Sequence, residues 1–340
     1  MKKRVNYLDV MKLIGILFIF IGHYGDTAGY LYHFVFQFHV HLFFFISGCA
    51  ENFNKEKNIL CNAYKKFKSI MIPFYFFAII SIVFRVLLKN DSLSFVKESL
   101  IDIAHGCIRN EFFAYSLWFF SCLFIVSLIF SLLKQLKKWY LILAFSIGLF
   151  AIFYSGIITL PQYYNIRSAF NYQLFYVIGY LSFNQIDAIL NSKKTMANVF
   201  KYITGAYATG YTALLFFGKN IYSFISEIYV LNWFFQFFTA MTVIWFLLII
   251  SYFMQDISLF TSMGKCTLYF CGSEYLIKVV LGAYLPALFV TNITNGMSVI
   301  IVSIILLLLT YKFLVPIEQK ALSFINKKLD LCFSFLTKGK

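Results

Sequence analysis

The sequence predicts an all-α, polytopic membrane protein with about ten transmembrane helices in one bundle. Of its 340 residues, 61% are hydrophobic and only 13% are charged. Soluble domains carry roughly 25% charged residues, so this composition excludes an ordinary soluble fold. Several apolar runs also approach or exceed the ~20 residues that a helix needs to cross a bilayer.

The apolar runs and the basic residues between them predict the order of the helices and their orientation. The expected helices cover residues 10–24, 31–51, 70–89, 112–133, 139–155, 171–188, 199–217, 228–254, 266–290 and 297–317. With a cytoplasmic N-terminus, most Lys and Arg residues fall in inner loops and tails, and the outer loops hold only Lys89, Lys97, Arg109, Arg167 and Lys219. This asymmetry follows the positive-inside rule and predicts that both termini are cytoplasmic.

The net charge of +15 is therefore assigned to topology and to contact with anionic lipid headgroups, not to nucleic acid. We expect a multi-pass protein of the cell membrane, with residues 1–318 as one transmembrane domain and 319–340 as a basic cytoplasmic tail.

The first expected helix carries polar residues on one face. Lys12 and His23 are eleven positions apart, which on an α-helix places them within roughly 20° of each other and ~16 Å apart along the axis. Either they line a protein cavity, or Lys12 snorkels to one interface and His23 lies at the other. Asp9 either neutralises Lys12 or holds it in position. Asp26 either orients His23 or is solvated.

The second expected helix carries His33, Gln37, His39 and His41. In a regular helix His33, Gln37 and His41 share a face and His39 points elsewhere. No carboxylate or thiol completes a known zinc spacing, so we predict no metal site and no bound cofactor.

Later segments add three further expectations. The long outer loop at 90–111 has mixed charges and amphipathic character, which favour a short interfacial helix. Trp118 offers an aromatic face for a sugar ring, although tryptophans are also common at membrane interfaces without a ligand. Glu274 and Lys278, at i and i+4, form either a structural ion pair or part of a cavity lining.

Two motifs carry a resemblance to a known family. Lys12, ten residues and His23 are followed by Phe38-His39 and then by Leu42-Phe43-Phe44-Phe45-Ile46-Ser47-Gly48. This arrangement resembles the integral-membrane acyltransferase-3 family of bacterial O-acyltransferases. Later landmarks in the same order are Ile72-Pro73-Phe74-Tyr75, Leu117-Trp118-Phe119-Phe120, Gly179-Tyr180-Leu181 and Gly264-Lys265-Cys266-Thr267-Leu268. The resemblance runs from about residue 5 to about residue 315.

The chain departs from that family at three positions. Lys12 stands where the family usually has Arg, which keeps the charge but loses the planar fork. Val40-His41 stands where many members have Met-Pro, and Glu274 stands where many have a histidine.

The resemblance implies transfer of an acyl group, usually acetyl, from cytoplasmic acyl-CoA to a hydroxyl of a cell-surface or lipid-linked glycan in the bacterial plasma membrane. On this hypothesis His23 is the general base, a task suited to histidine, and His39 is a second catalytic contact. Lys12, Asp9, Trp118 and Glu274 bind donor or acceptor. A transient acyl-histidine is the other chemical route. A transporter or flippase of a polar or lipid-linked substrate, or a non-enzymatic scaffold, is the alternative function.

Overall fold

The computed structural model describes residues 5–338 except 57, 90, 157, 218–228 and 285–295. The chain is 85% helical, and its described residues contain no strand. In the first half the helical segments are α1 (Asn6–Gly22), η1 (Gly25–Ala28), α2 (Tyr30–Phe36), α3 (His39–Glu51), α4 (Ile59–Lys66), η2 (Phe67–Met71), α5 (Ile72–Lys89), α6 (Leu93–Ala104), α7 (Trp118–Leu133), η3 (Lys134–Leu136) and α8 (Trp139–Ser155). In the second half they are η4 (Tyr163–Asn165), α9 (Ile166–Asn191), α10 (Thr195–Phe216), α11 (Tyr229–Phe253), α12 (Ser258–Gly264), α13 (Thr267–Tyr284), α15 (Gly296–Leu309), η6 (Thr310–Leu314) and α16 (Val315–Lys338).

Five of the described helical stretches are long and apolar enough to cross a membrane. They are Tyr30–Glu51, Ile59–Lys89, Trp118–Leu136, Asn232–Phe253 and Gly296–Leu331, and Trp139–Ser155 is a shorter apolar helix. The chain is thus an all-helical membrane protein, while the count of ten spans and the cytoplasmic placement of both termini stay predictions.

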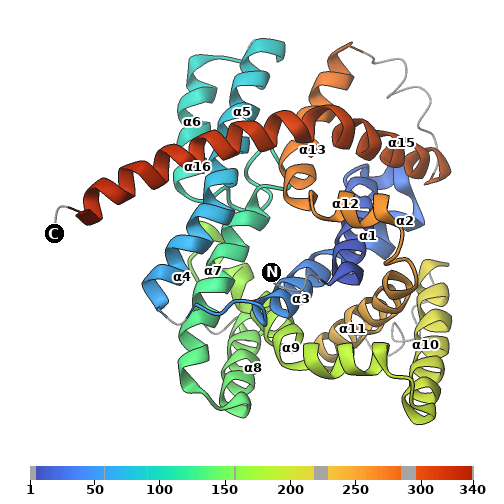
Figure 1. The fold of residues 1–340 in the computed structure, drawn as a ribbon. Helices are drawn as coiled ribbons and strands as arrows, with labels where there is room; N and C mark the ends of the chain where they lie inside the picture. Colours follow the sequence, from blue (N-terminus) through green and yellow to red (C-terminus); the bar gives the residue numbers. More distant parts are fainter. Residues whose placement is uncertain are drawn as a thin grey trace.

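Helix α1 lies inside the bundle, where it contacts α2, α3, α11, α12, α13 and α15 (Figure 1). Its two sides join two different hydrophobic cores. Tyr7 and Met11 belong to the core built with α3, α7, α9 and α11. Ile16 and Phe20 belong to the core built with α5 and α13. A polar group on α1 between these cores is therefore enclosed by protein.

Glycines permit the closest helix contacts in this arrangement. A Cβ on Gly48 of α3 would lie 1.9 Å from the carbonyl oxygen of Tyr176 in α9, and a Cβ on Gly264 of α12 would lie 1.9 Å from that of Asp9 in α1. Small residues at such crossings let backbones approach, as is common between membrane helices. Gly48 therefore lets α3 pack closely against α9, and Gly264 lets α12 pack closely against α1.

The prediction of one continuous helix at 31–51 was wrong, because the structure interrupts this helix. Helix α2 ends at Phe36 and α3 begins at His39, with Phe38 at φ −144° and ψ −23° between them. The face shared by His33, Gln37 and His41 in a regular helix is consequently lost. His33 is exposed, whereas His41 packs against the aromatic rings of α9.

The predicted helix at 112–133 begins later, at Trp118. Residues before it form turns, with positive φ at Gly106, Cys107 and Asn110. The segment 90–111 does contain the predicted short helix, α6. Helix α9 extends beyond the predicted 171–188 in both directions. The predicted helix at 266–290 corresponds to α13 as far as Tyr284, with 285–290 outside the described residues.

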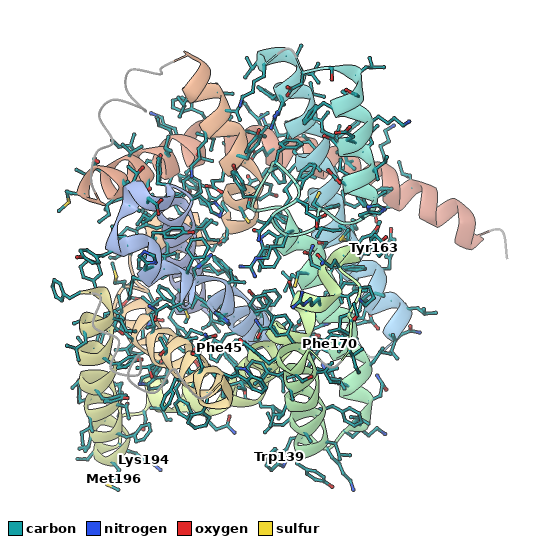
Figure 2. The ribbon with its side chains drawn as sticks, turned by 180° about the vertical axis from the view of Figure 1, so that it is seen from behind. Phe45, Trp139, Tyr163, Phe170, Lys194 and Met196 are labelled. Atoms are coloured by element: carbon teal, nitrogen blue, oxygen red, sulfur yellow. The ribbon has the colours of Figure 1, made fainter. Side chains whose placement is uncertain are left out.

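Two of the loops that were predicted to lie on the inner side of the membrane, at 134–138 and 189–198, lie at the same end of the molecule (Figure 2). Figure 2 shows Trp139, at the start of α8, at the same end as Lys194 and Met196, at the start of α10. At the C-terminus, α15, η6 and α16 form one helical rod that crosses the molecule and extends past it (Figure 1). The predicted tail at 319–340 is thus helical as far as Lys338.

Candidate active site

A cavity of about 210 Å³ is lined by Lys12, Ile16 and Ile19 of α1, and we call it the inner cavity because it lies nearer the N-terminus of that helix than the next one. Its polar lining includes Lys12 from α1, Ser47 from α3, and Lys265 and Thr267 from the segment that joins α12 to α13. The remaining walls are mostly apolar side chains of α1, α3 and α7. A cavity with two cations in its lining and otherwise mostly apolar walls suits a ligand with an anionic head and an uncharged arm.

A second cavity of about 190 Å³, called the outer cavity, lies next to the inner one. Ile19, Phe43, Phe119 and Cys271 line both cavities, so the two are adjacent across these four side chains. The outer cavity is also lined by His23, His39, Arg109, Asn110, Tyr115, Ser116 and Trp118. Lys12 and His23 therefore each line a cavity within the protein, which agrees with the first of the two interpretations of their spacing.

Lys12 is paired with Asp9, one turn earlier on α1. The Lys12 Nζ to Asp9 Oδ1 distance is 3.1 Å, and the Asp9 side chain is only 2% exposed. Asp9 thus neutralises Lys12 and also restrains it at the cavity wall. Asp9 itself does not line either cavity, so a direct contact from Asp9 to a ligand stays a prediction.

His23 is joined to a carboxylate from the far end of the chain. Its Nδ1 lies 2.6 Å from Oε2 of Glu274 in α13, and the Glu274 side chain is 2% exposed. Lys278 Nζ lies 2.7 Å from the other oxygen, Oε1, with the geometry of an ion pair and not of an aligned hydrogen bond. Lys278 also lies 4.4 Å from the ring centroid of Tyr24. The predicted i, i+4 ion pair of Glu274 and Lys278 is therefore present, and Glu274 contacts His23 as well.

This arrangement determines which nitrogen of His23 can act as a base. An ionised carboxylate has no proton to donate, so the Nδ1–H of His23 donates to Glu274. The neutral imidazole then has its lone pair on Nε2. His23 lines the outer cavity and is 17% exposed. It thus combines a buried orienting carboxylate with an imidazole at the cavity wall, which is the geometry of a general base and its partner.

Asp26 does not take this orienting role. Its side chain is exposed, in the turn that follows α1, and His23 is bonded to Glu274 instead. The exposed position agrees with the solvated alternative.

His39 is the second histidine of the outer cavity. It is the first residue of α3, and its Nδ1 lies 2.8 Å from the carbonyl oxygen of Val35 in α2. A carbonyl oxygen only accepts, so Nδ1 is the donor and Nε2 is the acceptor of a neutral ring. The interruption between α2 and α3 therefore gives Nδ1 of His39 a backbone partner and leaves Nε2 as the acceptor of a ring that lines the outer cavity.

Trp118, the first residue of α7, also lines the outer cavity, but one of its faces is occupied. The guanidinium of Arg109 lies 4.6 Å from its ring centroid, a cation–π contact. A sugar ring stacked directly on that face would have to displace Arg109.

Four of the six predicted site residues line one of the two adjacent cavities: Lys12, His23, His39 and Trp118. Glu274 contacts His23, and Asp9 contacts Lys12. Their roles stay predictions. Sequence reasoning did not select Lys265 or Arg109. Lys265 lies in the Gly264–Leu268 landmark, and Arg109 is one of several charged residues in the outer loop at 90–111, so its local sequence did not set it apart. Among the described residues, no group of three or more His, Cys, Asp or Glu side chains could hold a metal ion.

Comparison with known proteins gives one match. The family described as "Acyltransferase domain" (Acyl_transf_3) matches residues 5–312, which is most of the 340-residue chain. Neither a curated protein nor a solved structure matches the chain.

Proposed function

Because the chain belongs to the acyltransferase-3 family, we propose that it moves an acyl group, usually acetyl, from cytoplasmic acyl-CoA to a hydroxyl of a cell-surface or lipid-linked glycan. Its proposed place is the bacterial plasma membrane, as a multi-pass protein with both termini in the cytoplasm. The single observation that carries the proposal is the hydrogen bond between His23 and Glu274 at the wall of the outer cavity, which lies next to the cavity lined by Lys12.

The inner cavity is the proposed donor site. Lys12 and Lys265 would contact the phosphates of CoA, and the uncharged pantetheine arm would follow the apolar walls toward the outer cavity. Lys12 and His23 are separated by ~16 Å along α1, so a ligand that reaches both must be long and thin. An acyl-pantetheine arm has that shape.

The outer cavity is the proposed site of transfer. His23 Nε2 takes the proton of the acceptor hydroxyl, and the hydroxyl oxygen forms a bond to the thioester carbonyl carbon. The carbon–sulfur bond then breaks, and the proton on His23 passes to the leaving sulfur, which yields free CoA and the ester. Glu274 stabilises the imidazolium that exists between these two proton transfers.

Radiolabelled acetyl-CoA with the purified protein in lipid nanodiscs tests this proposal. We expect thioester turnover by the native protein, loss of at least 100-fold in His23→Ala, on the order of what general base catalysis contributes, and retained turnover in His33→Ala, a matched control with an exposed histidine. Full turnover by correctly folded His23→Ala protein would refute the role of His23. Uptake of a substrate into vesicles without any turnover would favour the transporter.

A further inference from the structure

Arg109 places a cation in the outer cavity that the proposed chemistry does not use. The residue comes from the turns between α6 and α7, and its side chain lines the same cavity as His23 and His39. One guanidinium nitrogen, Nη1, donates to the hydroxyl oxygen of Tyr172 in α9 at 3.3 Å, and the guanidinium lies over the Trp118 ring. These contacts hold the fork of donors at the cavity wall.

The turn that carries Arg109 is rigidly built. Asn165, buried at the start of α9, accepts a hydrogen bond from the Arg109 backbone N–H at 2.9 Å. Its amide group donates to the carbonyl oxygens of Gly106 and Cys107, each at 3.2 Å, and to Ser121 Oγ at 2.9 Å. The position of Arg109 is therefore fixed before any ligand arrives, a condition that favours selective binding.

The charge of Arg109 is not balanced within the cavity. It is the only residue with a formal charge among the described residues that line this space. No carboxylate oxygen in the described part of the chain lies within 4.0 Å of it, whereas Glu274 behind His23 is already matched by Lys278. A partly enclosed guanidinium without an anion favours a ligand that brings one, and its planar fork fits carboxylate or phosphate oxygens.

The anion cannot come from the donor in the proposed reaction. The phosphates of CoA lie at the opposite end of the pantetheine arm from the acyl group, and they match Lys12 and Lys265 in the inner cavity. Only the neutral acyl end reaches the outer cavity. A negative group beside Arg109 must then belong to the second substrate.

We propose that Arg109 binds an anionic group of the acceptor, so that this protein acts on a glycan that carries a carboxylate or a phosphate close to the hydroxyl that receives the acyl group. This inference rests on the proposed function for the identity of the ligand as an acceptor. It goes beyond that function in giving the acceptor a chemical class and a residue that selects it.

Three sugars with similar rings test the proposal: methyl β-D-glucuronide, glucose 6-phosphate and the neutral methyl β-D-glucoside. Each is titrated into the purified protein in lipid nanodiscs, and its dissociation constant is measured by saturation-transfer NMR. We expect at least one anionic sugar to bind roughly 10-fold or more tightly than the glucoside, because a charge-assisted hydrogen bond is lost in the neutral sugar. The better of the two anions identifies the carboxylate or the phosphate as the native group.

Arg109→Gln should reduce the affinity for the anionic sugar to that for the glucoside without changing the latter. Arg109→Lys should retain part of the preference, since the charge remains and the fork is lost. Arg167→Gln is the matched control. The Arg167 guanidinium carbon also lies over an aromatic ring, 5.7 Å from the Phe153 centroid, but Arg167 is exposed and lines neither the inner nor the outer cavity. This variant should leave all three affinities unchanged.

Equal binding of the three sugars to the native protein would overturn the proposal, and so would an equal loss for all three in Arg109→Gln, which indicates a structural role. If Arg109→Gln does not fold, the native preference and the Arg109→Lys protein still decide the question. Failure of the proposed function has a different signature: His23→Ala would then keep its acetyl-CoA turnover, whatever the sugar titrations show.

Discussion

Replacement of Glu274 by Gln isolates the contribution of the orienting carboxylate. The side chain keeps its length and shape, but it loses the negative charge that faces His23 Nδ1 at 2.6 Å and Lys278 Nζ at 2.7 Å. A glutamine amide can present N–H as well as C=O to Nδ1. Where N–H faces the ring, the imidazole proton moves to Nε2, and Nε2 then has no lone pair with which to act as a base.

The magnitude follows from the hydrogen bond that is lost. A bond to a charged group contributes about 1.5–3 kcal/mol, and each 1.36 kcal/mol of activation free energy is a factor of ten in rate. If the Glu274 charge acts on the imidazolium formed during transfer, kcat should fall roughly 10- to 150-fold in Glu274→Gln. The KM for acetyl-CoA should change little, since Glu274 does not line the inner cavity.

Initial rates of thioester turnover with labelled acetyl-CoA measure both quantities in purified protein. Glu318→Gln is a matched control, because Glu318 is another buried carboxylate that lines neither the inner nor the outer cavity. Native kcat in a folded Glu274→Gln protein would refute the reasoning. A rise in KM alone would indicate that Glu274 acts on donor binding and not on the proton transfer.

Three further predictions concern the donor site and the framework around it. Lys12→Met should raise the KM for acetyl-CoA by roughly 10-fold, in line with the loss of about 1.4 kcal/mol of binding, with a smaller effect on kcat; an unchanged KM in steady-state assays would exclude Lys12 from donor binding. Gly264→Ala should lower the melting temperature, because its Cβ would lie 1.9 Å from the Asp9 carbonyl oxygen and such overpacking costs about 1–3 kcal/mol. Gly148→Ala, where nothing lies within 4 Å of the added Cβ, should not lower it. Asn165→Ala leaves two carbonyl oxygens and one N–H without their side-chain partner, so thermal unfolding should show a loss of about 1–3 kcal/mol; a native melting curve would contradict this account of the turn.

The positions of Lys12 and His23 were accessible to sequence reasoning because helical periodicity relates them within one segment. Their placement at protein cavities follows from the cost of charged groups in lipid. The partner of His23 was not accessible in the same way. Glu274 is 251 positions away, and only the packing of α13 against α1 brings the two side chains into contact.

Two features of the site had weak local signals or none. The chain between α2 and α3 contains neither Pro nor Gly, so an uninterrupted helix was the natural expectation, and the interruption that gives His39 its Val35 partner depends on tertiary packing. Gly106 indicated a turn before α7, but that turn, with positive φ at Cys107 and Asn110, is held by the hydrogen bonds that Asn165, a residue of a distant segment, makes with the Cys107 carbonyl and the Arg109 N–H. Arg109 therefore lines the outer cavity because of contacts with a distant segment, and the residues next to it in the sequence do not reveal those contacts.

A structure of the protein with acetonyl-CoA, in which a methylene group is inserted between the sulfur and the carbonyl carbon of acetyl-CoA so that no thioester can be cleaved, tests the central claim most directly. Cryo-electron microscopy of this complex should place the analogue through both cavities, with its phosphates beside Lys12 and Lys265 and its carbonyl carbon in the outer cavity near His23 Nε2. An analogue bound outside these cavities, or bound with its carbonyl end away from His23, would contradict the account.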